Sequence, residues 1–329
     1  MSSGRDRAEV SRREAIASLA GVAALPALLG VFDANAAPLT YELRPELVAP
    51  GIWVIRGAQE AIERSNGGAI ANVTIFDTRD GAVIVDTGPS KRYGLTLEAL
   101  VRQLTGKPVV RAYLTHFHPD HVFGNQAFAA NVLSAPRGVI DGLAELGEAF
   151  ASAMYHAAGD WMRGTEVVQP GTVCSDGVET IGERRFRLIG LGGHTPSDLA
   201  LIEETSGILV AGDLAFLDRA PTTPHADLGR WRSSLDTLSS IAHTRLVPGH
   251  GPVEQGARGI AQTRDWLSVV EETIRTAFDR GFSSNEAMAE PLPAWTEKVA
   301  LARYEFERSV MHFYPKLEAG EWPRVDKAG

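Results

Sequence analysis

The chain of 329 residues contains one cysteine, Cys174, and no long Ser-, Gln- or Pro-rich tract. A single cysteine excludes an intramolecular disulfide, so packing alone must hold the fold together. No histidine lies close to Cys174 in the sequence, and we therefore expect a structural thiol rather than a nucleophile or a metal ligand. With 44% hydrophobic and 22% charged residues, the composition is that of an ordinary globular protein.

Positive charge is also scarce in this sequence. The formal net charge is −9, and after the N-terminal segment no basic run is longer than Arg184-Arg185. Such a surface offers little to a phosphate backbone, so we expect no nucleic acid partner. No shift in composition marks a flexible linker, and one main domain is the default expectation.

The first 36 residues have the order of an export signal. A basic opening, Arg5 to Arg13, precedes the apolar run Ile16 to Phe32 and the small-residue segment Ala34-Asn35-Ala36. This order predicts a signal peptide over residues 1–36 that is removed before Ala37. The apolar run is interrupted by glycine and proline and is short for crossing ~30 Å of hydrocarbon, so we expect no stable membrane anchor.

Two adjacent arginines in Ser11-Arg12-Arg13 make this leader resemble a twin-arginine export signal. Ala15 departs from that pattern, because a bulkier apolar residue usually stands there. The resemblance implies export of an already folded, metal-loaded protein and a periplasmic location. An ordinary secretory signal with two chance arginines is the alternative.

The mature chain alternates β-rich and helical segments. Residues 51–55, 71–76, 82–86 and 109–114 are predicted strands, and the apolar spacing after Ser90 predicts a helix that ends at Gly106. Strands are again predicted at 186–189, 199–202, 208–210 and 245–247, and helices at 138–164, 229–242 and 260–317, the last divided near 281–293. We therefore expect an α/β domain over residues 37–258 and a helical C-terminal extension, residues 259–329, packed on it.

Three imidazoles and a carboxylate fall within six residues in His116-x-His118-x-Asp120-His121, directly after a predicted strand. Alternation along an extended chain places His116 and His118 on one side. The turn at Pro119 lets Asp120 and His121 address a second point nearby. The spacing therefore predicts two neighbouring metal positions at the end of a strand.

Three further candidate ligands follow, each beside glycine and each expected at the carboxyl end of a strand. They are His194 in Gly193-His194-Thr195-Pro196, Asp213 in Gly212-Asp213, and His250 in Pro248-Gly249-His250-Gly251. Glycine leaves the backbone free to turn and leaves room for a substrate. Any one of these residues alone would be weak evidence, but together with the first motif they predict a metal centre.

The order of these motifs resembles the metallo-β-lactamase superfamily over about residues 51–251. The resemblance implies an αββα sandwich with the metal site at one edge. It also implies that one metal ion is bound by His116, His118 and His194, and a second by Asp120, His121 and His250. Asp213 would bridge the two ions, and Asp86 would support the ligands from outside the ligand set.

Imidazole and carboxylate ligands without thiolate suit two zinc ions, although iron or manganese would also fit. Zinc coordination lowers the pKa of water to ~7 and would supply a hydroxide nucleophile. Asp120 is the predicted catalytic residue, because it would orient that hydroxide and carry a proton toward the leaving group. The expected activity is zinc-dependent hydrolysis of an ester, thioester, lactone or similar bond in a small molecule.

Within the superfamily, the leader and the segments Asp86 to Ser90, Thr115 to Asn125 and Gly193 to Asp198 most resemble the quinoprotein relay system zinc metallohydrolases. These are relatives of the sulfur-oxidation-associated periplasmic metallohydrolase. The resemblance implies a periplasmic pathway, and with it a protein partner from that pathway. A carboxylate at Asp213 argues against a true β-lactamase, where the two-zinc subclasses have cysteine or no Asp bridge.

Two other classes of function stay open. A mononuclear iron persulfide dioxygenase would use only His116, His194 and Asp213, and a non-catalytic protein would merely bind metal for a pathway. Specificity is expected from residues 57–68 and 138–164, where the polar candidates Arg64, Tyr155 and His156 are more readily explained as surface residues. His225 and His243 are likewise predicted to be structural or surface residues.

Overall fold

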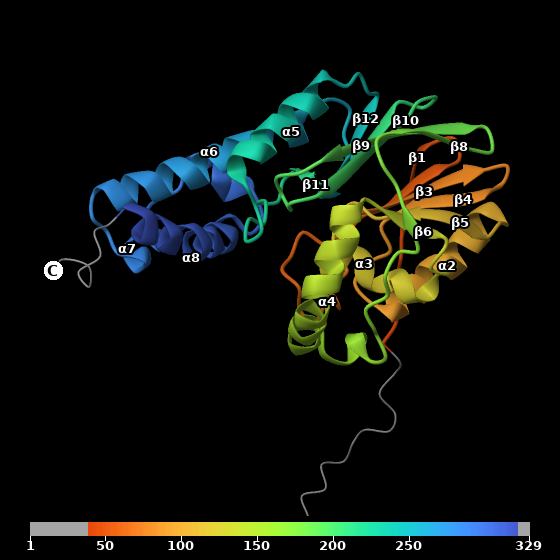
Figure 1. The fold of residues 1–329 in the computed structure, drawn as a ribbon, viewed down its shortest axis with the longest axis horizontal. Helices are drawn as coiled ribbons and strands as arrows, with labels where there is room; N and C mark the ends of the chain where they lie inside the picture. Colours follow the sequence, from red (N-terminus) through yellow and green to blue (C-terminus); the bar gives the residue numbers. More distant parts are fainter. Residues whose placement is uncertain (1–38, 322–329) are drawn as a thin grey trace, which may run out of the picture. The chain divides into compact units, whose positions relative to one another are not determined.

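The computed structural model describes residues 39–321 (Figure 1). The predicted signal peptide, residues 1–36, lies outside the described residues. Among the helices that the structure describes, none has the length and apolar character needed to span a membrane.

Two β-sheets form the centre of the fold. The first has seven strands in sequence order, antiparallel from β1 to β4 and parallel from β4 to β7. Its strands are β1 (Pro45–Ala49), β2 (Ile52–Ile55), β3 (Val73–Thr78), β4 (Gly81–Val85), β5 (Val109–Tyr113), β6 (Leu133–Ala135) and β7 (Thr172–Val173). The second sheet has the order β12-β11-β10-β9-β8, with β11 and β12 parallel. Its strands are β8 (Gly177–Ile181), β9 (Arg184–Leu191), β10 (Asp198–Glu203), β11 (Ile208–Phe216) and β12 (Arg245–His250).

Alternating side chains along buried strands separate the layers of the fold. In β4, Val83 and Val85 enter the core between the two sheets, whereas Ala82 and Ile84 face the helix on the outer side. The second sheet repeats this division, with Ile208 and Val210 packed between the sheets and Leu209 on the opposite face. These strands are therefore covered on both faces.

Helices lie outside both sheets, as an αββα sandwich requires. On the first sheet, α2 (Lys91–Thr105) begins after the Ser90 cap, whose side chain accepts a hydrogen bond from the Tyr93 amide, and it ends at Gly106 in the left-handed conformation. On the second sheet, α5 (Leu228–Ser240) buries its apolar stripe in a core that it shares with the C-terminal helices. The predicted fold class is confirmed.

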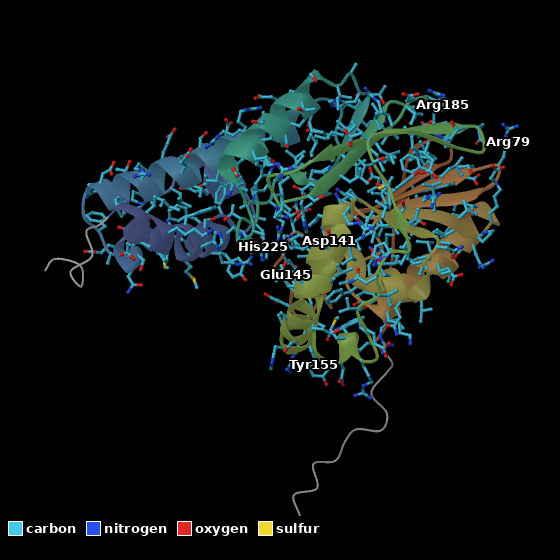
Figure 2. All side chains as sticks on the ribbon, viewed as in Figure 1. Arg79, Asp141, Glu145, Tyr155, Arg185 and His225 are labelled. Carbon is cyan, nitrogen blue, oxygen red and sulfur yellow. The ribbon has the colours of Figure 1, made fainter. Side chains whose placement is uncertain are left out.

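The remaining helical segments connect these layers and extend the chain. Figure 2 shows α4 (Arg137–Ala158) with Asp141, Glu145 and Tyr155 labelled along it. The connecting segments are α3 (Pro119–Val122), η1 (Phe123–Ala127) and η2 (Gly159–Met162), and the C-terminal region contains α6 (Arg258–Asp279), α7 (Ser284–Met288), η3 (Ala294–Lys298) and α8 (Ala302–Glu321). The helices predicted over residues 260–317 and their interruption near 281–293 are thus present. Their apolar residues, such as Trp266, Phe306 and Tyr314, belong to the same core as α5 and β11.

One predicted feature of the strands differs in the structure. Asp213 lies inside β11, which continues to Phe216, rather than at the end of a strand. The pairing of β11 with β12 shifts register on both sides of Gly212, whose φ is 54°. A bulge bends a strand and re-aims a side chain, so the irregular pairing here accounts for how Asp213 faces the other candidate ligands from within a strand.

Candidate metal centre

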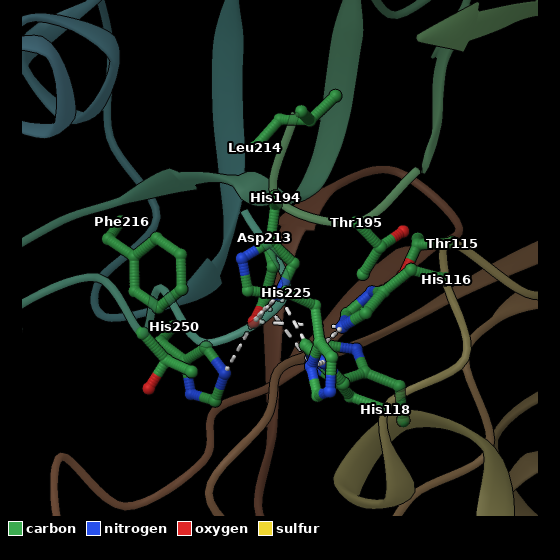
Figure 3. A network of polar contacts seen from close by, with 12 residues as sticks. Thr115, His116, His118, His194, Thr195, Asp213, Leu214, Phe216, His225 and His250 are labelled. Atoms are coloured by element: carbon green, nitrogen blue, oxygen red, sulfur yellow. Dashed lines mark hydrogen bonds and ion pairs between the residues drawn. The ribbon is translucent and has the colours of Figure 1, made fainter. Parts of the chain in front are cut away.

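The seven predicted ligands come from five separate segments and form two groups. Figure 3 shows five of them: His116, His118, His194, Asp213 and His250. His116 and His118 lie in the loop after β5, and α3 contributes Asp120 and His121. The other three come from the second sheet: His194 from the turn between β9 and β10, Asp213 from β11 and His250 from the end of β12. All seven side chains are buried.

The first group consists of three histidines whose ring nitrogens face one another. His118 Nδ1 lies 3.0 Å from His116 Nε2 and 2.9 Å from His194 Nε2. Asp213 Oδ2 lies 3.3 Å from His194 Nε2 and 3.8 Å from His116 Nε2. Ligand atoms about 2.1 Å from one tetrahedral ion would be roughly 3.4 Å apart, so this spacing suits a shared metal ion.

The second group consists of one carboxylate and two histidines. Asp120 Oδ2 lies 3.6 Å from His121 Nε2 and 3.4 Å from His250 Nε2. Asp213 also contacts this group, with Oδ1 3.1 Å from His121 Nε2 and Oδ2 3.3 Å from His250 Nε2. Asp213 therefore lies between the two groups.

Buried atoms without partners test whether these residues fit metal ions. His121 Nε2 and Asp213 Oδ1 are both buried, and although they lie 3.1 Å apart, neither atom makes a hydrogen bond among the described residues. Buried polar atoms are normally satisfied, and a divalent cation is the partner that a lone pair on nitrogen and one on a carboxylate oxygen can share. The His and Asp clusters thus fit the two metal positions of a dimetal site.

Burial and neighbouring charges together set the protonation of the ligands. Burial, together with neighbouring histidines, lowers the pKa of His116 and of His118 well below the usual value, which leaves both imidazoles neutral. Burial alone would raise the pKa of Asp213, but His250, His121 and His116 outweigh it and hold that pKa well below its usual value. Without metal, Asp213, Asp120 and Asp86 overcome burial and raise the pKa of His121. A cation would displace that proton.

Residues behind the ligands fix their orientation. Asp86 Oδ2 lies 2.7 Å from His121 Nδ1, and Asp86 Oδ1 accepts a hydrogen bond of 2.8 Å from the Thr115 amide. Asp86 has a φ of 65°, a conformation that asparagine and aspartate adopt more readily than bulkier residues. On the other side, Nδ1 of His250 lies 2.8 Å from the carbonyl oxygen of Ile70. These contacts leave Nε2 of both histidines for the centre.

The ligands open onto a cavity of about 360 Å³. Four ligands form one wall, and apolar residues from the loop after β2 and from α4 form another: Ala61, Ile62, Ile70, Phe150, Ala153, Met154 and Ala157. A larger and more open hollow of about 1100 Å³ lies elsewhere and includes none of the seven ligands. The smaller cavity is therefore the one that adjoins the metal centre.

Comparison with known proteins identifies the family. A model of the metallo-beta-lactamase superfamily matches residues 66–250, more than half of the chain. The chain belongs to the metallo-β-lactamase superfamily.

Two curated relatives are more distant in sequence. The linear primary-alkylsulfatase of Pseudomonas sp. is 21% identical over 256 residues, which cover 64% of this chain and 48% of that protein. The beta-lactamase-like protein 2 homolog of Caenorhabditis elegans is 26% identical over 184 residues, covering 55% and 56%. The chain thus spans about half the length of these relatives.

Solved structures share the fold. The stereoselective inverting sec-alkylsulfatase Pisa1 from Pseudomonas sp. matches with a TM-score of 0.63 and 19% identity, covering 86% of this chain and 52% of that one. A metallo-beta-lactamase from Pontibacter korlensis matches with a TM-score of 0.57 and 20% identity, covering 69% of this chain and 99% of that one. Residues 1–258, all those before the helical extension, make up about 78% of the 329 residues. The 86% covered by the first match therefore includes residues of the extension.

Sequence reasoning missed two parts of the chain that line the cavity beside the metal centre. His225, predicted to be structural or on the surface, lines the cavity, and its Nδ1 lies 2.9 Å from His118 Nε2. Burial lowers the pKa of His225 to about 4, with further lowering from His194 and from three basic residues of α8: His312, Arg308 and Lys316. The second contribution is α8 itself, which supplies Tyr304, Glu305 and Arg308 to the cavity. Neither has a sequence motif.

Other predictions fare differently. The segments expected to set specificity do line the cavity, but through Ala61, Ile62 and the α4 residues, and the lining includes none of the polar candidates Arg64, Tyr155 and His156. Figure 2 shows Tyr155 well separated from His225. His243 is structural as predicted, since its two ring nitrogens contact the carbonyl oxygens of Ile241 and Gly256.

Proposed function

We propose that the protein is a hydrolase that uses two zinc ions to cleave an ester, thioester, lactone or similar bond in a small molecule. The position of the Asp213 carboxylate carries this proposal, because it lies within 3.8 Å of nitrogens from both ligand groups. A carboxylate in that position is suited to bridge two ions. Two zinc ions in such a site lower the pKa of bound water to about 7 and so supply a nucleophile near neutral pH.

The protein's own groups perform the remaining tasks. Asp120 has one carboxylate oxygen near His121 and His250 and lines the cavity, so it can both hold a ligand position and accept or return a proton. His118 and His250 line the same wall. The apolar wall around Phe150 and Met154 gives a substrate an apolar surface to contact.

The alternatives predict different site chemistry. A mononuclear iron dioxygenase would need His116, His194 and Asp213 and would leave the second group without a role. The burial of Asp120, His121 and His250 beside Asp213 favours two ions instead. Similarity to an alkylsulfatase supports adding sulfate esters to the substrates to be tested.

A substrate screen tests the proposed activity. Purified mature protein loaded with zinc would be assayed against carboxylic esters, thioesters, lactones, sulfate esters, phosphodiesters and β-lactams. We expect turnover of at least one ester-type substrate and loss of that turnover after chelation. Absence of hydrolysis across the screen, with both zinc ions bound, would favour a non-catalytic metal-binding protein.

We further propose that the protein acts in the periplasm after twin-arginine export and serves a pathway like that of the quinoprotein relay metallohydrolases. The leader and the short motifs described above support this. Changing Arg12 and Arg13 to lysine should retain a folded precursor in the cytoplasm. Normal export of this variant, measured by cell fractionation, would contradict the twin-arginine route.

A further inference from the structure

Four polar side chains form a row along α8. Tyr304, Arg308, His312 and Lys316 recur at intervals of four residues and therefore share one face. Tyr304 and Arg308 line the cavity that contains the metal ligands. The Arg308 guanidinium lies 5.5 Å from the centre of the Tyr304 ring, and Lys316 Nζ lies 2.7 Å from His312 Nε2, so these two pairs are in contact.

Arg308 is held in place but not enclosed. Its Nη1 donates to Glu305 Oε2 at 2.9 Å and to Thr222 Oγ1 at 3.2 Å. Its side chain is nevertheless 37% exposed. An arginine has five N–H donors, so two contacts made by one nitrogen leave further donors of this guanidinium for a ligand in the cavity.

The charges around Arg308 do not cancel. Glu305 is fully buried, with its carboxylate 3.6 Å from Arg219 and 2.9 Å from Arg308. One carboxylate thus faces two guanidinium groups, of which Arg219 is almost fully buried and Arg308 reaches the cavity. The other two acidic residues of the lining, Asp120 and Asp213, belong to the metal ligand set, where cations would neutralise them. The α8 side of the cavity therefore carries net positive charge in a chain whose formal charge is −9.

We propose that the substrate carries an anionic group besides its scissile bond, and that Arg308 on α8 binds this group while the apolar wall contacts the rest of the molecule. This inference rests on the proposed hydrolytic function and names its substrate class: a small amphiphilic ester with a carboxylate, sulfate or phosphate group. Arginine suits these groups because its planar donors match their oxygens in pairs. Arg308 is thus a specificity-determining residue, supplied by the C-terminal extension.

Two esters that differ in one charge test the proposal. Mono-4-nitrophenyl suberate has a free carboxylate at the end of its acyl chain, and 4-nitrophenyl octanoate has an acyl chain of the same length without charge. For Arg308→Gln, we expect the ratio of kcat/KM for the anionic ester to that for the neutral ester to fall about 10-fold or more, as loss of a charge-assisted hydrogen bond implies. Arg308→Lys should recover part of the ratio.

The matched control is Arg102→Gln, which removes the same charge from α2, outside the cavity. The ratio should stay at the parent value in this variant. An unchanged ratio in Arg308→Gln, or an equal fall in Arg102→Gln, would overturn the proposal. Zinc content and circular dichroism of each variant identify any that has lost its fold, and Arg308→Lys then provides the comparison.

A binding measurement separates this inference from the proposed activity. Octanoate and octanamide would be titrated into zinc-loaded protein by calorimetry. Any direct contact of the carboxylate with zinc is common to all variants. The difference in octanoate affinity between Arg308→Gln and Arg102→Gln therefore measures the contribution of Arg308. We expect octanoate to bind about 10-fold more weakly to Arg308→Gln alone, even if neither ester is hydrolysed. Equal octanoate affinity in both variants would overturn the anion site.

Discussion

His225 Nδ1 lies 2.9 Å from His118 Nε2, on the side of the His118 ring opposite the metal centre. His118 directs Nδ1 toward His116 and His194. A neutral imidazole whose Nδ1 binds a metal carries its proton on Nε2, so His118 would donate that proton to His225. The rings of Phe117 and Phe150 pack against His225 with centroids 5.9 and 5.7 Å away and restrict its movement. His225 is therefore a positioning residue for His118.

Replacing His225 tests this role. His225→Ala should lower zinc affinity about 10- to 100-fold, because outer partners of ligating histidines contribute that much to metal binding. Competition with a chromophoric chelator would measure the change. His243→Ala is the control, since His243 contacts carbonyl oxygens away from the ligands. Equal zinc affinity in the two variants would mean that His225 does not orient His118.

Asp120 and His118 should behave differently when changed. Asp120→Asn keeps the shape but loses the carboxylate that reaches His121 and His250. Hydrolysis should fall about 10²- to 10⁴-fold, the usual contribution of acid–base assistance, while metal at the three-histidine group largely remains. His118→Ala deletes a ligand of that group, so metal content and rate should fall together. Zinc content measured beside the initial rate distinguishes the two, and a near-normal rate in Asp120→Asn would refute its assigned role.

Gly249 provides a test that leaves every ligand in the sequence. A Cβ atom at this position would lie 1.9 Å from Asp213 Oδ1 and 2.7 Å from the backbone carbon of Gly212. Gly249→Ala must therefore displace Asp213, and we expect loss of at least one metal ion together with loss of activity. Gly320→Ala on α8, where a Cβ meets nothing within 4 Å, is the control. Full metal content in Gly249→Ala would contradict a bridging position for Asp213.

Local signals explain what the sequence could predict. The Ser90 cap and Gly106 define α2 because each acts on its own turn. An unbroken apolar run identifies β4 because this strand is covered on both faces. The ligands were found because His116, His118, Asp120 and His121 are neighbours in the chain. The other ligands lie beside glycine in short motifs. In each case, residues close in sequence carry the information.

Contacts between distant segments explain the rest. His225 is 107 residues from His118 and stands in a loop with no motif, so only the fold brings the two rings together. In the sequence, the spacing of polar residues around Arg308 is that of any exposed helix face. The proposed role of Arg308 depends on the position of α8 beside the cavity. The place of Asp213 inside β11 depends on a bulge that arises from pairing with β12.

Elemental analysis of the mature protein, purified under native conditions without added metal, tests the central claim most directly. The seven buried ligands and the shared Asp213 carboxylate predict close to two zinc ions per chain. Mass spectrometry of the intact protein under native conditions would give the same count independently. One tightly bound iron per chain, with no zinc, would contradict the dinuclear hydrolase and favour the mononuclear dioxygenase.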